Sequence, residues 1–301
     1  MKTFLAGGTG VVGTRALPAL VAAGHDVTAV ARTEVKAELV RSLGGAPVTV
    51  DLFDADAVRA AVVGHEVVIN LATSIPPIAK AARGSAWTTN ERLRSEASNH
   101  LVDGALAAGA GRYVQESIAF PYLDHGDQWI DEDHPVDHTG PFAGARDAEA
   151  AAARFADRSG AGVVLRYAQF YASDSTHTKA ANATVRWRIN PFVGDPGGYA
   201  SFIHAEDAGS AVVAALRAPS GTYNVVDDEP LTRAEAGKIV AQALGVKPPH
   251  ALPKVVRAVS PSSAKLLMKS LRVSNGRFKA ATDWLPVHPS LRGSWPTETS
   301  S

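Results

Sequence analysis

The sequence predicts an α/β protein with a doubly wound parallel sheet of the Rossmann type, followed by a small C-terminal substrate lobe. Two patterns predict this class. Short β-branched runs alternate with alanine-rich helical stretches up to about residue 166, and glycines follow the first run directly. A chain of 301 residues can bury about 75% of its unfolded surface, which allows one large domain or two unequal lobes.

Six strands and five helices are expected to alternate in this part of the chain. The strands are Thr3–Ala6, Asp26–Val30, Pro47–Val50, Val67–Leu71, Arg112–Gln115 and Gly162–Arg166. The helices between them are Val12–Ala23, Val35–Ser42, Ala55–Val63, Asn90–Ala108 and Phe142–Ala156. Glycines beyond the helical stretches supply their C-terminal stops, which supports these boundaries.

The regular alternation fades after Arg166, and glycine, proline, asparagine and aromatic residues become more frequent. We therefore expect residues 1–166 to form the dinucleotide-binding domain and residues 167–293 to form mainly a substrate-binding lobe. Segments around 200–226 are expected to return to the first domain, and residues 294–301 to form a disordered tail.

Two helices are predicted in the second lobe. Thr232 and Glu235 form a capping box that opens a helix over Ala234–Leu244. Ser260 and Pro261 open another that runs to about Val273. A basic face is expected on this second helix, formed by Lys265, Lys269 and Arg272.

The charge balance and the lack of cysteine restrict the function. Thirty basic residues face thirty acidic ones, so no global charge attracts nucleic acid, and we expect no nucleic-acid partner. Without cysteine there are no disulfides, thiol nucleophiles or zinc knuckles. No apolar run approaches the ~20 residues of a membrane span. We expect a cytoplasmic protein without a membrane partner.

Three glycines after the first strand are the strongest chemical signal. Gly7, Gly10 and Gly13 stand in the segment GGTGVVG, between a predicted strand and a predicted helix. Such glycines permit a tight turn, close approach of a diphosphate and close helix–strand packing. The loop residues Thr9, Val11 and Val12 are therefore also assigned to the cofactor site.

The residues after the next strands extend the predicted cofactor site. Arg32 follows the second strand, where a NAD-specific protein usually carries an acidic residue, and a guanidinium suits a 2′-phosphate. NADP(H) is therefore the preferred cofactor, with NAD(H) as the alternative. Asp51 and Leu52 follow the third strand, and Ala72 and Thr73 follow the fourth.

Together these segments resemble the extended and atypical short-chain dehydrogenase/reductases, including NAD-dependent epimerase/dehydratases and NmrA-like proteins. Besides GGTGVVG, the resemblance includes RYVQES, IDEDHP, VLRYAQFY, SFIHAEDAGSAVVAAL and GTYNVVDDEPLT, in the family's order and over nearly the whole chain. It implies a nucleotide cofactor on the N-terminal sheet, a small-molecule substrate under a C-terminal lobe, and a homodimer as one arrangement.

The same resemblance implies a catalytic Ser, Tyr and Lys, and here the sequence departs from the family. Ser117 stands in the serine position. The YxxxK pattern is degenerate, with Phe142 for tyrosine and Arg146 for lysine. Phenylalanine has no ionisable hydrogen, so it cannot serve as acid or base. Arg146 can still hold a ribose hydroxyl, but guanidinium stays charged and is no proton relay.

Other residues are candidates for the missing proton donor and for the substrate pocket. Tyr122, Tyr167 and His138 lie near the expected pocket in sequence, and each is also compatible with a simple packing role. The resemblance places three further residues at the substrate pocket: Phe170, Tyr171 and His204. Histidines and carboxylates gather in residues 124–138, but their irregular spacing fits a solvated loop, so no metal site is predicted.

These observations predict an NADP(H)-dependent oxidoreductase of the extended short-chain type, acting on a carbonyl or alcohol. Ser117 would orient the substrate oxygen and Arg146 would hold the ribose. A nucleotide-sugar epimerase or dehydratase is one alternative. A non-catalytic NADP(H)-binding sensor or regulatory protein, in which Phe142 and Arg146 record lost chemistry, is the other.

Overall fold

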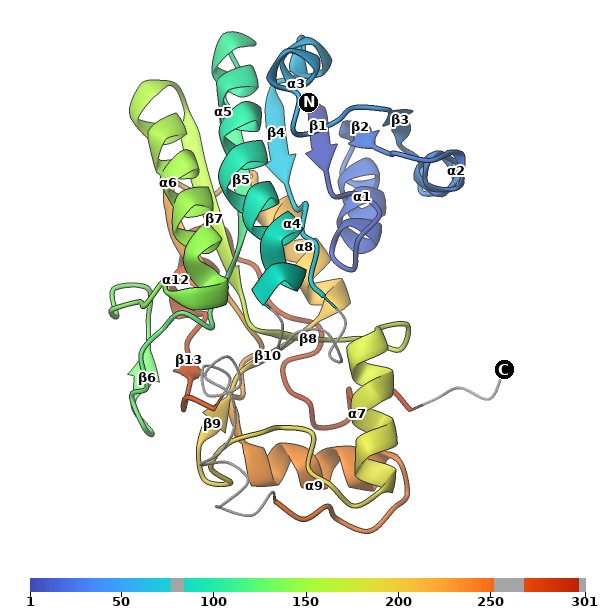
Figure 1. The fold of residues 1–301 in the computed structure, drawn as a ribbon, viewed down its shortest axis with the longest axis vertical. Coiled ribbons are helices and arrows are strands. Elements are labelled where there is room, and N and C mark those ends of the chain that lie inside the picture. Colours follow the sequence, from blue (N-terminus) through green and yellow to red (C-terminus); the bar gives the residue numbers. More distant parts are fainter. Residues whose placement is uncertain (77–83, 252–267, 298–301) are drawn as a thin grey trace.

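A seven-stranded parallel sheet forms the centre of the computed structural model, in the order β11-β7-β5-β4-β1-β2-β3 (Figure 1). The structure describes residues 1–76, 84–251 and 268–297. Starting from β1, the chain adds β2 and β3 on one side of the sheet and the later strands on the other side. This is the doubly wound arrangement that the sequence predicts. The predicted fold class is confirmed.

The sheet strands are β1 (Lys2–Ala6), β2 (Asp26–Val30), β3 (Ala46–Val48), β4 (Val67–Asn70), β5 (Arg112–Ile118), β7 (Ala161–Tyr167) and β11 (Gly221–Val225). The helices around it are α1 (Gly13–Ala22), α2 (Glu34–Ser42), α3 (Ala55–Val62), α4 (Thr88–Arg92), α5 (Ser98–Ala107), α6 (Ala143–Arg158), α8 (Ala205–Ala215) and α12 (Gly276–Thr282). Each predicted strand has its counterpart here. The seventh strand, β11, was not predicted as a strand.

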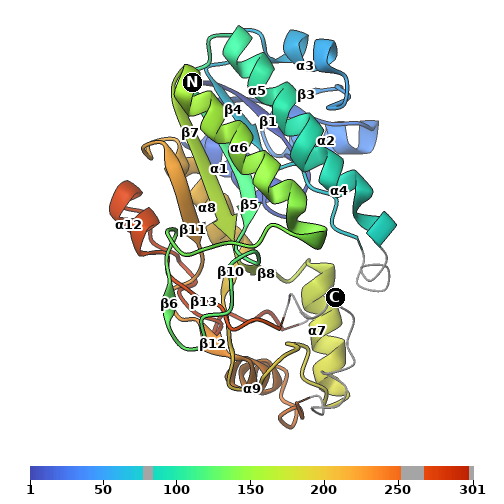
Figure 2. The ribbon, with the colours of Figure 1, turned by 60° about the vertical axis from the view of Figure 1, so that its left-hand side comes forward.

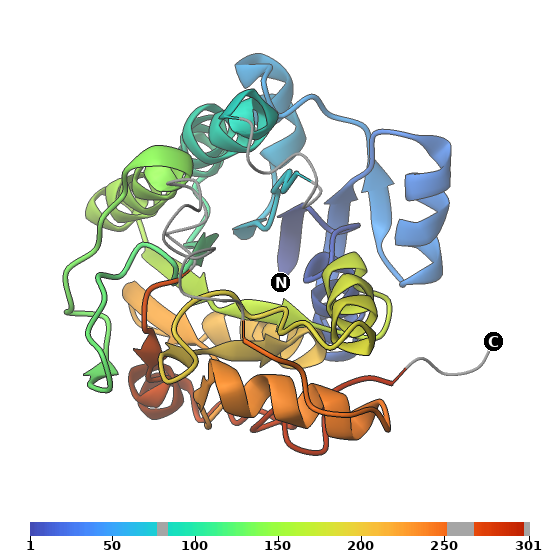
Figure 3. The same ribbon diagram turned by 60° about the horizontal axis from the view of Figure 1, so that its bottom comes forward.

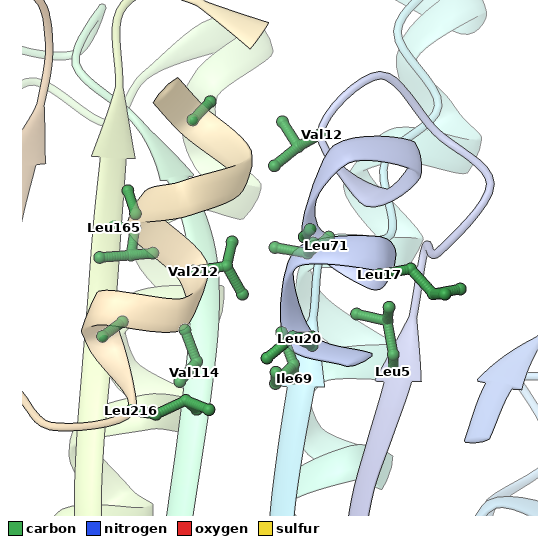
Figure 4. Packing of buried hydrophobic residues seen from close by; sticks show 14 of the residues in the cluster. Leu5, Val12, Leu17, Leu20, Ile69, Leu71, Val114, Leu165, Val212 and Leu216 are labelled. Carbon is green, nitrogen blue, oxygen red and sulfur yellow. The ribbon is translucent and has the colours of Figure 1, made fainter. Parts of the chain in front are cut away.

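Two hydrophobic clusters cover the two faces of the sheet. On one face α1 and α8 pack together, and Leu17 of α1 and Val212 of α8 join strand residues such as Leu165 (Figure 4). On the other face α3, α5 and α6 bury their apolar sides, and Figure 2 shows α5 and α6 side by side. Phe4 and Leu5 point into opposite clusters because side chains alternate along a strand.

The helix predicted at Asn90–Ala108 is interrupted. α4 leads into a π-helical turn over Leu93–Ala97, and α5 then continues to Ala107. Within this turn Arg94 is buried, and its Nη2 donates to both carboxylate oxygens of Glu116 at 2.9 and 2.7 Å. The wider π-helical turn accommodates this buried ion pair. Hydrophobic periodicity in the sequence does not reveal such a turn.

A second lobe lies beyond the carboxyl ends of the strands (Figures 1 and 3). It contains β8 (Gln169–Tyr171), α7 (Thr176–Arg186), β9 (Tyr199–Ala200), β10 (Phe202–His204), β12 (Leu231–Thr232) and α9 (Arg233–Ala243). The predicted capping box of Thr232 and Glu235 is present at the start of α9. With α8 and β11 the chain returns to the sheet domain, where α8 packs against α1 and β11 pairs with β7.

Two expectations for the C-terminal part are wrong. Trp295, placed in a disordered tail, is buried; its Nε1 donates to Asn182 at 2.8 Å and its ring stacks on Tyr171. The helix expected to reach Val273 does not: Arg272–Val273 is strand β13, paired with β6 (Trp129–Ile130). Most of that predicted helix, with Lys265, lies outside the described residues.

The expected basic face is also absent where the structure describes it. Lys269 turns inward and its Nζ donates to the carbonyl oxygens of Phe120 and Tyr122 at 3.3 and 2.9 Å. Arg272 stacks over the Trp129 ring. These bonds tie Lys269 to the turn over Phe120–Tyr122, and burial lowers the pKa of Lys269. None of the helices in the described ranges has the length and apolar character that crossing a membrane requires.

Candidate active site

The turn from β1 into α1 is shaped as a cradle for an anionic group. Gly7 has φ +83°, and a Cβ there would lie 2.4 Å from the Leu71 carbonyl carbon. A Cβ on Gly13 would lie 2.1 Å from the Gly7 oxygen. No side chain caps α1, and its first turn has no acidic residue, so the positive end of the helix is open to a diphosphate. The glycine positions therefore fit a dinucleotide.

Two cations stand near this cradle. Arg32, two residues beyond the end of β2, is exposed, and so are Gly10 and Val11 of the glycine turn. Lys36 in α2 reaches back toward the cradle, with its Nζ 3.5 Å from the Thr9 oxygen. The nearby Glu34 carboxylate is bonded to Arg41 at 2.8 Å. Arg32 and Lys36 thus place two cations on the β2–α2 side of the cradle.

The remaining predicted cofactor residues lie beyond the carboxyl ends of β3 and β4. Asp51 is exposed, and one of its oxygens accepts from the Phe53 amide at 3.0 Å. Leu52 is buried. The Ala72 amide donates to Asn70 Oδ1 at 3.1 Å, which fixes the exit of β4, and Thr73 is exposed. These positions border the carboxyl edge of the sheet, where open α/β sheets bind ligands.

Ser117 lies at the end of β5, buried, and its hydroxyl donates to Glu149 Oε1 at 2.6 Å. Arg166 of β7 binds the same carboxylate twice, at 2.9 and 2.6 Å. Although burial opposes the charge, these bonds to Glu149 raise the pKa of Arg166 above its ordinary value. The serine hydroxyl hydrogen is therefore engaged by a fixed carboxylate.

Phe142 and Arg146 differ in their surroundings. Phe142 is buried and stacks on Phe120, with ring centroids 6.1 Å apart. Arg146, one turn later in α6, is 68% exposed and contacts Asp147 at 3.2 Å. Glu149 follows at the next turn, so the three positions share one side of the helix. The predicted tyrosine position is thus a hydrophobic contact.

The structure argues against both candidate tyrosines as proton donors. Tyr122 is buried; its hydroxyl donates to Asn224 at 2.9 Å and accepts from Arg166 at 2.8 Å. Tyr167 is buried in the sheet core and donates to the Ala208 oxygen at 3.1 Å. Burial raises the pKa of both phenols, most strongly that of Tyr167. Both hydroxyls serve the packing of the protein.

His138 is the remaining candidate for the proton donor. It reaches the bonded group of Ser117, Glu149 and Arg166, which we call the serine network. Its Nε2 is buried, lies 4.0 Å from Glu149 Oε2 and has no hydrogen-bond partner. Burial lowers the pKa of His138, with the Glu149 charge opposing the shift. The His138 ring thus reaches the carboxylate that holds the Ser117 hydroxyl.

The three predicted substrate residues have structural partners. Phe170 packs against Tyr167. Tyr171 is buried in the core of the second lobe, and its hydroxyl donates to the Ser290 oxygen at 3.4 Å. His204 caps α8 by accepting from the Glu206 amide at 3.3 Å. Packing accounts for Tyr171, so it is a poor candidate for substrate contact.

Sequence reasoning missed Glu149 and Lys36. Glu149 was detectable as an acidic residue seven positions after Phe142, on the same helical face. Lys36 was detectable as a second cation in the first turn of the helix after Arg32. A glycine cradle, an open helix N-terminus and adjacent cations at the carboxyl edge of a parallel sheet define a dinucleotide-binding Rossmann protein.

Comparisons with known proteins agree with this class. The family model described as NAD(P)H-binding matches residues 7–219. A 3-diazoavenalumate denitrifying reductase from a Streptomyces species is 33% identical over 97% of this chain and 98% of its own. A 4-hydroxy-2-methyl-3-oxo-4-farnesyl-3,4-dihydroquinoline-1-oxide ketoreductase from Stigmatella aurantiaca is 30% identical over 48% of this chain and 41% of its own.

A solved structure extends the agreement to the whole fold. The human epimerase family protein SDR39U1, isoform 2, with NADPH, superposes with a TM-score of 0.80 at 24% identity, covering 98% of this chain and 97% of that one. The chain belongs to the NAD(P)H-binding family. It is an NAD(P)-dependent enzyme whose curated relatives are reductases, which disfavours the non-catalytic alternative.

Proposed function

We propose that this protein is an NADPH-dependent reductase that removes nitrogen from an aromatic diazo compound. The observation that carries the proposal is the hydrophobic contact of Phe142 with Phe120 at the position of the family's tyrosine acid. The reaction must therefore proceed without a phenol as proton donor. The name of the Streptomyces relative, which matches along the whole chain, describes such a denitrifying reduction.

Reduction of a diazonium ion to the arene balances without a proton donor at the reacting carbon. When bound, NADPH supplies a hydride that forms the new C–H bond of an aryl diazonium ion, while the C–N bond electrons leave with N2. No alkoxide forms, so no proton is consumed at that carbon. Carbonyl reduction, in contrast, generates an alkoxide, for which a positioned acid is typically worth about 10²–10⁴ in rate.

The chain's own residues supply binding and orientation. Gly7, Gly10 and Gly13 would hold the diphosphate of the cofactor, and Arg146 would hold its nicotinamide ribose. The Phe142 ring offers an apolar wall to an aromatic substrate. Glu149 places a carboxylate beneath Ser117.

Carbonyl or alcohol oxidoreduction is the second candidate, favoured by the partial match to a ketoreductase and by the serine at the family position. In this alternative Ser117 orients the oxygen and His138, beside Glu149, supplies the proton. Nucleotide-sugar epimerisation is disfavoured, because its first step removes the hydroxyl proton that the family's tyrosine accepts.

The experiment that tests the function follows NADPH consumption with para-carboxybenzenediazonium as the acceptor. Hydride transfer in solution gives a background rate, so the measurement uses NADPH deuterated on one face of the nicotinamide. We expect protein-dependent formation of the arene with deuterium transferred from one face only. No acceleration over the protein-free rate, together with turnover of an aromatic ketone, would replace the diazo proposal with the carbonyl one.

Arg32 and Lys36 are proposed to select NADPH over NADH. A charge-assisted bond to phosphate is worth about 1.5–3 kcal/mol, which corresponds to roughly tenfold or more in affinity. We expect Arg32→Ala and Lys36→Ala each to weaken NADPH binding about tenfold while leaving NADH binding unchanged, measured by calorimetric titration.

Arg41→Ala is the matched control for this prediction. Arg41 is another cation of α2, but its guanidinium is bonded to Glu34 and Glu38 at 2.8 and 3.0 Å. Its removal is expected to change neither affinity. Equal losses for NADPH and NADH in the Arg32 variant would show that this residue binds a part common to both cofactors and would contradict its selective role.

A further inference from the structure

Two histidines and a glutamate converge at the start of α8, away from the serine network. His204 ends β10, Glu206 lies in the first turn of α8, and His288 comes from a segment 82 positions further along the chain. One ligand atom from each lies within 4.8 Å of the other two. The two imidazole rings have centroids 3.9 Å apart, and His288 Nε2 lies 3.2 Å from Glu206 Oε2.

The distant segment is held in place by several bonds. Both carboxylate oxygens of buried Asp207 accept from backbone amides, those of Val287 and His288, at 2.7 and 2.8 Å. Trp284 Nε1 donates to Ser210 at 2.9 Å, which binds the same segment to α8. The three donor groups are thus brought together by the fold, so a ligand would not have to order them.

We infer that His204, Glu206 and His288 form a binding site for a divalent transition-metal ion, zinc by the chemistry of its donors. Imidazole nitrogen and carboxylate oxygen are zinc ligands, and two histidines with one glutamate are a known three-ligand set that leaves a fourth position for water. This site is separate from the proposed reduction and requires nothing from it.

The surroundings suit an ion of this charge. The Glu206 side chain is 68% exposed, so an ion can enter from solvent. The positive end of α8 opposes a cation, but Glu206 and Asp207 in its first turn offset that charge.

The test measures zinc binding to the full-length protein after treatment with EDTA. Titration with ZnCl2 in a calorimeter is expected to give one ion per chain, and CoCl2 to give the absorption bands of a low-coordinate cobalt site. Loss of an outer-sphere partner costs about 10–100-fold in metal affinity, so removal of a ligand should cost at least as much. We expect this loss for His288→Ala and Glu206→Gln.

His204→Asn tests the third ligand while keeping the helix cap, because asparagine is a good N-cap residue. His134→Ala is the matched control: that histidine is 27% exposed beside a carboxylate, against 26% for His288. Zinc binding retained by His134→Ala and lost in the other three variants, with all four folded by circular dichroism, supports the site. Absence of stoichiometric binding, or binding that survives His288→Ala, overturns it.

Discussion

Gly13→Ala is expected to abolish cofactor binding and to destabilise the protein. A Cβ at this position would lie 2.1 Å from the Gly7 oxygen and 2.7 Å from the Gly8 backbone, so the cradle must open. Overpacking of this kind costs typically 1–3 kcal/mol, and rigid backbone on the opposing side places this case at about 3 kcal/mol. We expect NADPH affinity to fall at least about 100-fold, measured by calorimetry alongside thermal unfolding.

Gly10→Ala separates binding from folding. A Cβ on Gly10 meets the Gly7 oxygen at 3.4 Å, which is ordinary contact, so the fold should tolerate the methyl group while the diphosphate loses its closest approach. Gly111→Ala is the control, because no atom lies within 4 Å of its Cβ position. Wild-type NADPH affinity in Gly10→Ala would show that the cofactor does not lie over this turn.

Local patterns account for most of the sheet domain. The strands from Lys2 to Tyr167 are short and rich in β-branched residues, and glycines lie close to most of the helix ends, so periodicity and stops locate them. β11 was missed as a strand because GTYNV lies beyond Arg166, where the regular alternation of strand and helix patterns fades. Its place beside β7 depends on α8 packing against α1, a contact between segments about 190 residues apart.

Side-chain roles were less predictable than the backbone. The cofactor cradle could be predicted, because the need for glycine at these positions depends on the local backbone. Tyr122 and Tyr167 are near the site in sequence, yet their hydroxyls bond to Asn224 and Ala208, which only the tertiary structure brings to them. The same holds for His204 and His288, which the fold places together from distant segments. Spacing cannot reveal such partners, because they depend on how strands and loops meet.

The substitution of tyrosine by Phe142 allows a direct test of the chemistry. The double variant Phe142→Tyr with Arg146→Lys restores the family's tyrosine just before α6 and its lysine in the first turn of that helix. The buried Phe142 ring contacts Phe120, and a hydroxyl adds little volume, so the fold should persist. We expect NADPH-dependent reduction of an aromatic ketone to rise by about 10²–10⁴, the usual worth of a positioned acid.

The same variant should leave diazonium reduction within about threefold of wild type, since that reaction takes no proton at the reacting carbon and so gains nothing from an acid. Tyr167→Phe is the matched control for a lost phenol, because its hydroxyl is bonded to the Ala208 oxygen within the sheet core. Measuring kcat and KM for both acceptors in each variant separates proton transfer from binding. A parallel gain for both acceptors would contradict a proton-free reduction and return the assignment to carbonyl chemistry.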